Sequence, residues 1–130
     1  MISSQPLDAA VNLTTTLTAS VNTHKQLGLY KHTVLMDWTP GTASNVFTIV
    51  IDFRVTGGQW VQEMVWDESQ TTGTYTRTLK QYQHTAANTT LISFVVLVDG
   101  HGDEVRIRTS ESEAGSSTKG TISATIYSSD

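Results

Sequence analysis

Apolar and polar residues alternate repeatedly along this chain with a period of two, which is the spacing of a β-strand with one buried face. The clearest segment is residues 45–55, where apolar residues at odd positions from Phe47 to Val55 alternate with Thr48, Val50, Asp52 and Arg54. No window sustains the i, i+3, i+4, i+7 apolar stripe of an amphipathic helix. The pattern therefore predicts an all-β protein.

Eight segments in all carry a strand signal, and turn residues separate them. They are the polar-flanked stretch around Val11, Leu13 and Leu17, then 29–38, 45–55, 60–66, 74–84, 91–98, 104–109 and 121–127. Thr56-Gly57-Gly58-Gln59 is typical of a tight hairpin, because paired glycines accept the positive φ angles of primed turns. Strands at this spacing predict a jelly-roll-like antiparallel β-sandwich of seven to eight strands.

Alternation also predicts which side chains form the core. The residues expected to point inward are Phe47, Ile49, Ile51, Phe53, Val95, Leu97, Val105, Ile107, Ile122 and Ile126. Residues 60–66 and 91–98 carry apolar side chains on both faces, so the first is expected to be a central strand and the second to be buried. One sandwich has only one interior, and the excess apolar surface predicts a homo-oligomer, with a trimer favoured.

The length of 130 residues is typical of one domain, so residues 1–130 are interpreted as a single β-sandwich. The first eight residues are polar apart from Met1, Ile2 and Leu7, and are expected to form a flexible N-terminal arm.

Without cysteine, stability must come from packing and backbone pairing. The net charge of −4 with scattered Lys and Arg argues against nucleic acid as a partner. No signal-peptide pattern or apolar membrane span is found, so a soluble protein made in the cytoplasm and no membrane partner are expected.

No catalytic, cofactor-binding or metal-binding residues are predicted, and the chain is interpreted as a non-enzyme without cofactors. The histidines form no ligand motif; they are His24, His32, His84 and His101. The run Asp99, His101, Asp103 and Glu104 lacks the spacing of a calcium loop, and a glycine-rich turn is the favoured interpretation. Neither a nucleophile elbow nor a phosphate-binding glycine loop occurs.

The aromatic residues leave one alternative open. Flat rings on an exposed sheet face can stack on sugars, and the candidates are Trp38, Trp60, Trp66, Tyr75, Tyr82 and Tyr127. Packing in a core or an interface is the competing interpretation. The two are distinguished by whether the three tryptophans are buried or lie exposed in one plane.

Three stretches carry a resemblance to a family. They are Val34-Leu35-Met36-Asp37-Trp38-Thr39-Pro40-Gly41, Val46-Phe47-Thr48-Ile49-Val50-Ile51-Asp52-Phe53 and Gly57-Gly58-Gln59-Trp60-Val61-Gln62-Glu63. This succession resembles small virion proteins of tailed bacteriophages. The C-terminal part of the chain carries the resemblance as well, with Val105-Arg106-Ile107-Arg108, a polar loop and then Gly120-Thr121-Ile122-Ser123. The chain departs from that pattern at Thr56-Gly57-Gly58 and at Val61, where the family usually has an Asp-Gly turn and an aromatic residue.

The resemblance implies a head-decoration, or capsid cement, protein. Such a protein docks on the major capsid protein at the exterior of the virion, often as a homotrimer. This step from fold to role is an analogy. Two other classes stay open: a carbohydrate-binding, lectin-like module on a phage or a secreted protein, and an enzyme whose site is assembled from loops.

Overall fold

The computed structural model describes residues 2–25, 28–100, 102–112 and 118–130. Every strand pairing among them is antiparallel. The strands are β1 (Ile2–Asn12), β2 (Thr18–Ala19), β3 (His24–Lys25), β4 (Lys31–Thr39), β5 (Val46–Arg54), β6 (Val61–Gln62), β7 (Met64–Glu68), β8 (Tyr75–Leu79), β9 (Tyr82–Thr85), β10 (Ile92–Asp99), β11 (Glu104–Ser112) and β12 (Thr121–Ser129).

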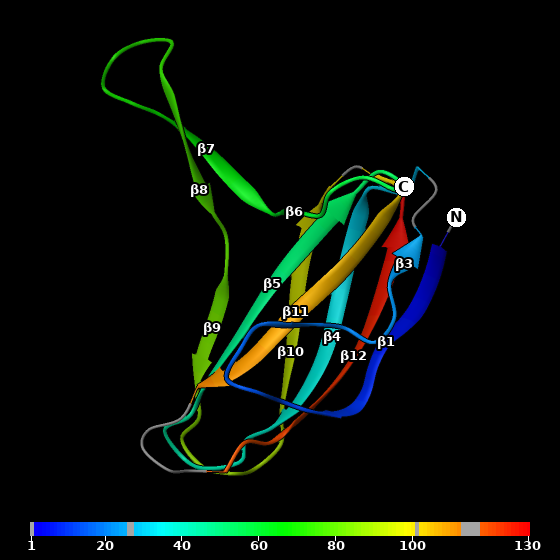
Figure 1. Cartoon of the computed structure of the whole chain (residues 1–130), viewed down its shortest axis with the longest axis vertical. Coiled ribbons are helices and arrows are strands. Elements are labelled where there is room, and N and C mark those ends of the chain that lie inside the picture. The colour runs from blue at the N-terminus through cyan, green and yellow to red at the C-terminus, as the bar shows by residue number, and fades with distance from the viewer. Residues whose placement is uncertain (1, 26–27, 101, 113–117) are drawn as a thin grey trace.

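Two sheets face each other, and a hairpin projects from them (Figure 1). Sheet I has the strand order β1-β12-β4-β10. Sheet II has the order β2-β11-β5-β6, with β3 also pairing with β11 and β9 also pairing with β5. The third pairing joins β7 to β8 alone, and this hairpin stands clear of both sheets in Figure 1. The predicted all-β antiparallel sandwich is confirmed.

The connectivity is that of a jelly roll. The short strands β2 and β3 both pair with β11, and β6 and β9 both pair with β5, so each couple occupies one strand position. Counted in this way, the sandwich has eight strand positions. When these are numbered by their order in the chain, their spatial order is 1-8-3-6 in sheet I and 2-7-4-5 in sheet II. This arrangement of eight strands in two sheets defines the jelly roll. The described residues form twelve strands rather than seven to eight because two positions are split and the β7–β8 hairpin is inserted within one of them.

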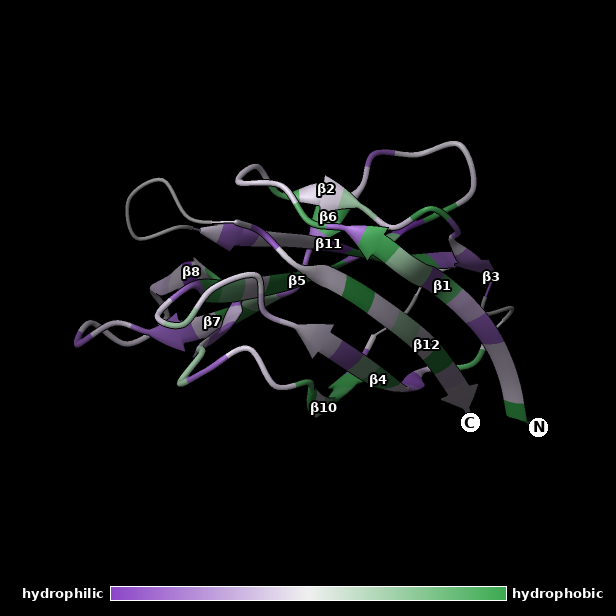
Figure 2. Ribbon diagram, turned by 90° about the horizontal axis from the view of Figure 1, so that it is seen from below, coloured by the Kyte–Doolittle hydropathy of each residue, from purple (hydrophilic) through white to green (hydrophobic). Residues whose placement is uncertain are grey.

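The core lies between the sheets, and its strands alternate as expected. On β4, His32, Val34, Met36 and Trp38 are buried while the residues between them face outward. Figure 2 shows the resulting bands of alternating hydropathy along the strands of both layers. The rings of Trp38 and Phe47 stack with centroids 5.2 Å apart, and Phe94 stacks on Phe47 at 5.8 Å. These aromatic residues join β4, β5 and β10 across the sandwich.

A buried carboxylate joins the loops at one end of the sandwich. Glu111 on β11 is fully buried. Its Oε1 accepts hydrogen bonds from Trp38 Nε1 at 2.7 Å and the Gly120 amide at 3.0 Å. Its Oε2 accepts them from Asn45 Nδ2 at 2.6 Å and the Gly41 amide at 2.9 Å. Burial alone would raise the pKa of Glu111, but these four hydrogen bonds outweigh burial and hold that pKa below its ordinary value.

The expected N-terminal arm is not present. Met1 lies outside the described residues, and residues 2–12 form β1, whose backbone pairs with β12 from Ile2 opposite Ser129 to Asn12 opposite Thr121. Leu7 is fully buried in the core, and Asp8 accepts a hydrogen bond from the Val21 amide at 2.8 Å. The expectation was wrong because backbone pairing at a sheet edge needs little apolar area from the added strand.

Two predictions about segments with apolar residues on both faces were also wrong. Residues 91–98 do not form a doubly buried strand, because β10 is the edge of sheet I and only one of its faces is covered. Val96 and Val98 point inward, whereas Val95 and Leu97, which were expected in the core, are 59% and 72% exposed. Residues 60–66 are not a central strand either, since β6 lies at the edge of sheet II and β7 belongs to the hairpin. The other expected core residues are buried, with Phe53 partly buried.

Candidate interaction surfaces

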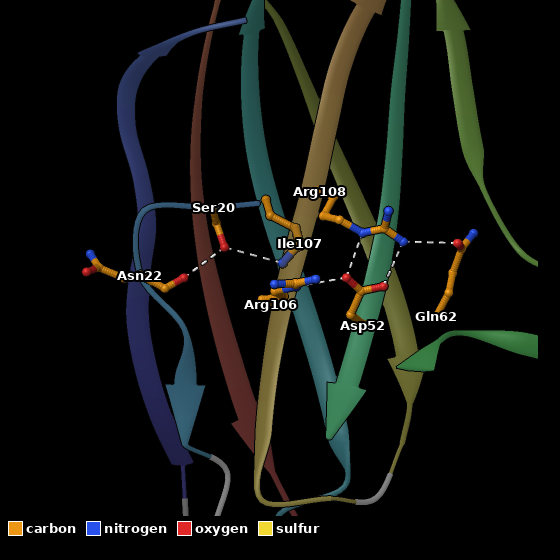
Figure 3. Close-up of polar contacts among 7 residues, drawn as sticks. All are labelled: Ser20, Asn22, Asp52, Gln62, Arg106, Ile107 and Arg108. Atoms are coloured by element: carbon orange, nitrogen blue, oxygen red, sulfur yellow. Dashed lines mark hydrogen bonds and ion pairs between the residues drawn. The ribbon is translucent and has the colours of Figure 1, made fainter. Parts of the chain in front are cut away.

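The outer face of sheet II carries a dense polar network (Figure 3). Asp52 of β5 is 1% exposed and lies opposite Arg106 in the β5–β11 register. Its Oδ2 accepts hydrogen bonds from Arg106 Nε at 2.9 Å and from Arg108 Nε at 2.7 Å, and Arg108 Nη2 reaches Oδ1 at 3.1 Å. Arg108 also donates to Gln62 Oε1 at 3.1 Å, which ties β6 to this cluster. The two guanidinium groups compensate the buried carboxylate, so the cluster holds the sheet together.

Two arginine side chains pack against the indole of Trp60. The guanidinium carbons of Arg54 and Arg106 lie 4.3 Å and 4.4 Å from its ring centroids. Arg54 in turn donates to Glu104 at 3.0 Å. The two guanidinium groups packed against the indole occupy ring surface that a sugar would need for stacking.

The base of the projecting hairpin (residues 63–80) is fixed to the sandwich by Glu63. The Glu63 amide donates to the Ile51 carbonyl oxygen and the Lys80 amide donates to the Glu63 carbonyl oxygen, each at 2.8 Å. The Glu63 carboxylate accepts a hydrogen bond from the Tyr82 hydroxyl at 2.9 Å and lies 3.6 Å from Lys80 Nζ. Burial and the Glu63 carboxylate both raise the pKa of Tyr82, and the Glu63 charge raises the pKa of Lys80. The hairpin therefore leaves the sandwich from a defined base.

Beyond this base the hairpin is amphipathic. The β7–β8 register places Met64 opposite Leu79, Trp66 opposite Arg77 and Glu68 opposite Tyr75, and paired residues share one side of a two-stranded ribbon. These six residues form the hairpin face. Its large side chains are uncovered: Trp66 is 60%, Tyr75 56% and Leu79 49% exposed. The opposite side of the ribbon carries Val65, Asp67, Thr76 and Thr78. Apolar side chains are therefore concentrated on the hairpin face.

A second uncovered apolar surface lies on the outer face of sheet I. It consists of Leu35 and Asp37 of β4, Ser93, Val95 and Leu97 of β10, and Tyr127 of β12, and is called the sheet I face below. The register places Leu35 beside Val95 and Asp37 beside Ser93, whose hydroxyl donates to the Asp37 carboxylate at 2.6 Å. Leu35 and Tyr127 are about two fifths exposed, and Val95 and Leu97 are more exposed still.

The histidines do not converge. His32 is buried, with Nδ1 2.7 Å from the Ser128 hydroxyl oxygen and Nε2 3.2 Å from the Gly100 carbonyl oxygen. His24 is buried on β3, where burial lowers its pKa, and His84 is exposed on β9 beside Phe94. His101 lies outside the described residues. Among the described residues no three His, Cys, Asp or Glu side chains are grouped to hold a metal ion.

The acidic run after β10 also disperses. Asp103 accepts a hydrogen bond from the Thr56 amide at 2.8 Å, which lowers the pKa of Asp103. Glu104 is turned toward Arg54, and Asp99 lies at the end of β10 opposite Lys31. These contacts connect loops to strands.

In the described part of the chain there is no helix long and apolar enough to cross a membrane.

The aromatic residues do not form one exposed plane. Trp38 is in the core, Trp60 packs against two arginines and Trp66 is on the hairpin face. Tyr82 bonds to Glu63, while Tyr75 and Tyr127 lie on the two apolar surfaces. Sequence reasoning named these residues but missed the surfaces that group them, because the grouping depends on the hairpin and on the edge position of β10.

No protein-family model matches the chain, and comparison with curated proteins and with solved structures gives no match either. The two exposed apolar surfaces are therefore the features from which a function is inferred.

Proposed function

We propose that this protein is a non-enzymatic structural protein of a phage virion, which decorates and stabilises the capsid by docking on the major capsid protein. The virion and the capsid partner are proposed because the sequence resembles small virion proteins of tailed bacteriophages. The jelly roll is compatible with this role, since viral capsid proteins are among the proteins that use it, although lectins use it as well.

The observation that carries the proposal is the uncovered hairpin face. A two-stranded hairpin alone is marginally stable in water, and it gains stability when its apolar side packs on another surface. Trp66 and Tyr75 are residue types that often dominate binding energy when an interface buries them. A hairpin with a fixed base and an apolar side directed away from its own core is suited to protein–protein docking.

The lectin-like alternative has less support. Burial of Trp38 and the two cations on Trp60 remove two of the three indole rings from any common sugar-stacking surface. Trp66 remains exposed, and a single ring next to Arg77 is better suited to a protein interface, where Trp and Arg are enriched.

Co-sedimentation with empty capsids, assembled from the major capsid protein of the same phage, tests the proposal. The protein is expected to pellet with the capsids to saturation, and Trp66→Ala is expected to weaken attachment at least about tenfold. Thr78→Ala, on the other side of the same ribbon, is the matched control and should attach normally. Failure of the unaltered protein to attach would overturn the proposal, and competition by simple sugars would favour the lectin-like alternative.

A further inference from the structure

The hairpin face needs a partner from outside its own copy. Glu63 fixes the base, and Figure 1 shows the hairpin extending away from the sandwich. Neither sheet of the same copy covers Trp66, Tyr75 or Leu79, which stay about half exposed or more. Any surface that covers these side chains therefore comes from another molecule.

The sheet I face has the complementary order of rows. Along a strand face, side chains repeat every two residues, or about 6.8 Å. On the hairpin, the apolar row Met64/Leu79 is followed by the row Trp66/Arg77. On sheet I, the apolar row Leu35/Val95 is followed by the row Asp37/Ser93. Each surface thus has an apolar row followed at the same spacing by a charged one.

The charges in these rows are opposite. Arg77 makes no hydrogen bond or ion pair with any described residue, so its guanidinium has its full donor capacity available. Asp37 is exposed and accepts the Ser93 hydroxyl through Oδ1, which leaves Oδ2 and the second lone pair of Oδ1 available to a guanidinium. When Arg77 is placed against Asp37, the Met64/Leu79 row falls on Leu35 and Val95.

We propose that the hairpin face of one copy packs on the sheet I face of a second copy, with Arg77 of the first paired to Asp37 of the second. The inference rests on the proposed function and deepens it: the surface that covers the hairpin face belongs to a second copy of this chain, and the assembly of copies attaches to the capsid by many weak contacts. Because the two surfaces differ, the contact is head to tail, and such contacts close into rings when the rotation between copies permits. A trimer, as expected from the sequence, is one such ring.

Sedimentation velocity of the purified protein without capsids, combined with charge reversal, tests the contact. The unaltered chain is expected to form a species heavier than the 14.2 kDa monomer as its concentration rises. Arg77→Asp and Asp37→Arg alone should each weaken association at least about tenfold, equivalent to about 1.4 kcal/mol. The double variant should recover most of this loss, because it restores an opposite-charge pair. Both residues are exposed, and unchanged far-ultraviolet circular dichroism at a concentration where every variant is a monomer will show that the variants fold.

Disulfide trapping tests the head-to-tail geometry, since the chain has no cysteine of its own. A mixture of Leu79→Cys and Leu35→Cys should form a disulfide-linked dimer on oxidation, because Leu79 lies two residues from Arg77 on β8 and Leu35 lies two residues from Asp37 on β4, and neither variant alone should do so efficiently. Thr76→Cys, on the opposite side of the ribbon, should not link to Leu35→Cys.

The outcomes separate this inference from the proposed function. A protein that remains a monomer at all concentrations, or a double variant without recovery, would overturn the contact between copies. Attachment of such a monomer to capsids would leave the virion role standing with the hairpin docked on the capsid. Association in solution without attachment to capsids would instead support the contact between copies and remove the capsid role.

Discussion

Replacing Glu111 with Gln tests the view that a buried charge joins the loops at one end of the sandwich. The substitution keeps the shape of the side chain and exchanges one carboxylate oxygen for an NH2 group. Each oxygen accepts two hydrogen bonds, so the NH2 group would face two donors, whichever way the amide is oriented. The variant therefore loses two charge-assisted hydrogen bonds and removes the charge from the other two. The two former donors and the two N–H groups of the new amide are then buried without acceptors.

The expected loss is large relative to the stability of a domain. A hydrogen bond to a charged group contributes about 1.5–3 kcal/mol, so losing two of them should lower the free energy of unfolding by about 3–6 kcal/mol. Domains of this size are typically stable by about 5–15 kcal/mol. With an m-value of about 2 kcal/mol/M, the urea midpoint should fall by about 1.5–3 M.

Urea unfolding at about pH 7, followed by tryptophan fluorescence, measures this loss because Trp38 donates directly to the carboxylate. Asp67→Asn removes the same unit of charge at an exposed position and should change stability by less than about 0.5 kcal/mol. The pKa of Glu111 is held below its ordinary value of 4.5, so its contribution is complete above that pH and is lost as the pH falls through the lower folded-state pKa. The difference between the two proteins should therefore shrink in acid. A loss below about 1 kcal/mol near neutral pH would refute the reasoning.

Two further predictions concern β1 and β3. Leu7→Ala should lower the free energy of unfolding by about 2–5 kcal/mol because Leu7 is fully buried, whereas Val21→Ala, which is exposed and lies outside both apolar surfaces, should have little effect. Equal midpoints in urea for the two variants would restore the interpretation of residues 1–8 as a flexible arm. Burial lowers the pKa of His24 below its ordinary 6.5, so the unfolded chain binds the proton more readily and stability should decrease as the pH falls from 6.5 toward the folded-state pKa. His24→Phe should flatten this part of the pH profile of thermal melting, and an unchanged slope would show that His24 does not cause it.

The fold could be predicted from the sequence wherever one face of a strand is clearly apolar. Apolar side chains recur at alternate positions on β4, β5, β11 and β12, and those strands occupy the middle of the two sheets. The jelly-roll class followed from them. On β4 and β12 the period-two pattern and the burial agree residue by residue, whereas on β5 the outward residues Thr48, Val50 and Asp52 are buried as well.

Alternation could not decide the register of β10. Residues 92–98 are apolar at six of seven positions, so the pattern is the same for either register. Aromatic packing decides it, because Phe94 stacks with Trp38 and Phe47 and thereby turns Val96 and Val98 inward and Val95 and Leu97 outward. That choice depends on β4 and β5, which are distant in sequence, and no local signal contains it.

The projecting hairpin was hidden for a related reason. A two-stranded ribbon has the same alternation as a strand of the sandwich, so residues 60–66 and 74–84 were interpreted as ordinary strands. Residues near the base join β5 at two separate places, with Gln62 opposite Asp52 and Tyr82 opposite Ile49. The candidate site was missed together with the hairpin, although its residues were individually named as aromatic candidates.

The position of the hairpin within the jelly roll explains how an exposed apolar surface can be tolerated. It interrupts the strand position shared by β6 and β9, and both of these still pair with β5 on either side of the interruption. Because Glu63 and Lys80 bond to each other at its base, the sandwich is closed before the hairpin begins. Changes in Trp66, Tyr75 or Arg77 should thus leave the core unaffected, so these residues are free to match a partner surface. The jelly roll supplies stability, and the inserted hairpin together with the outward side of β10 supplies the exposed apolar surfaces on which the proposed association depends.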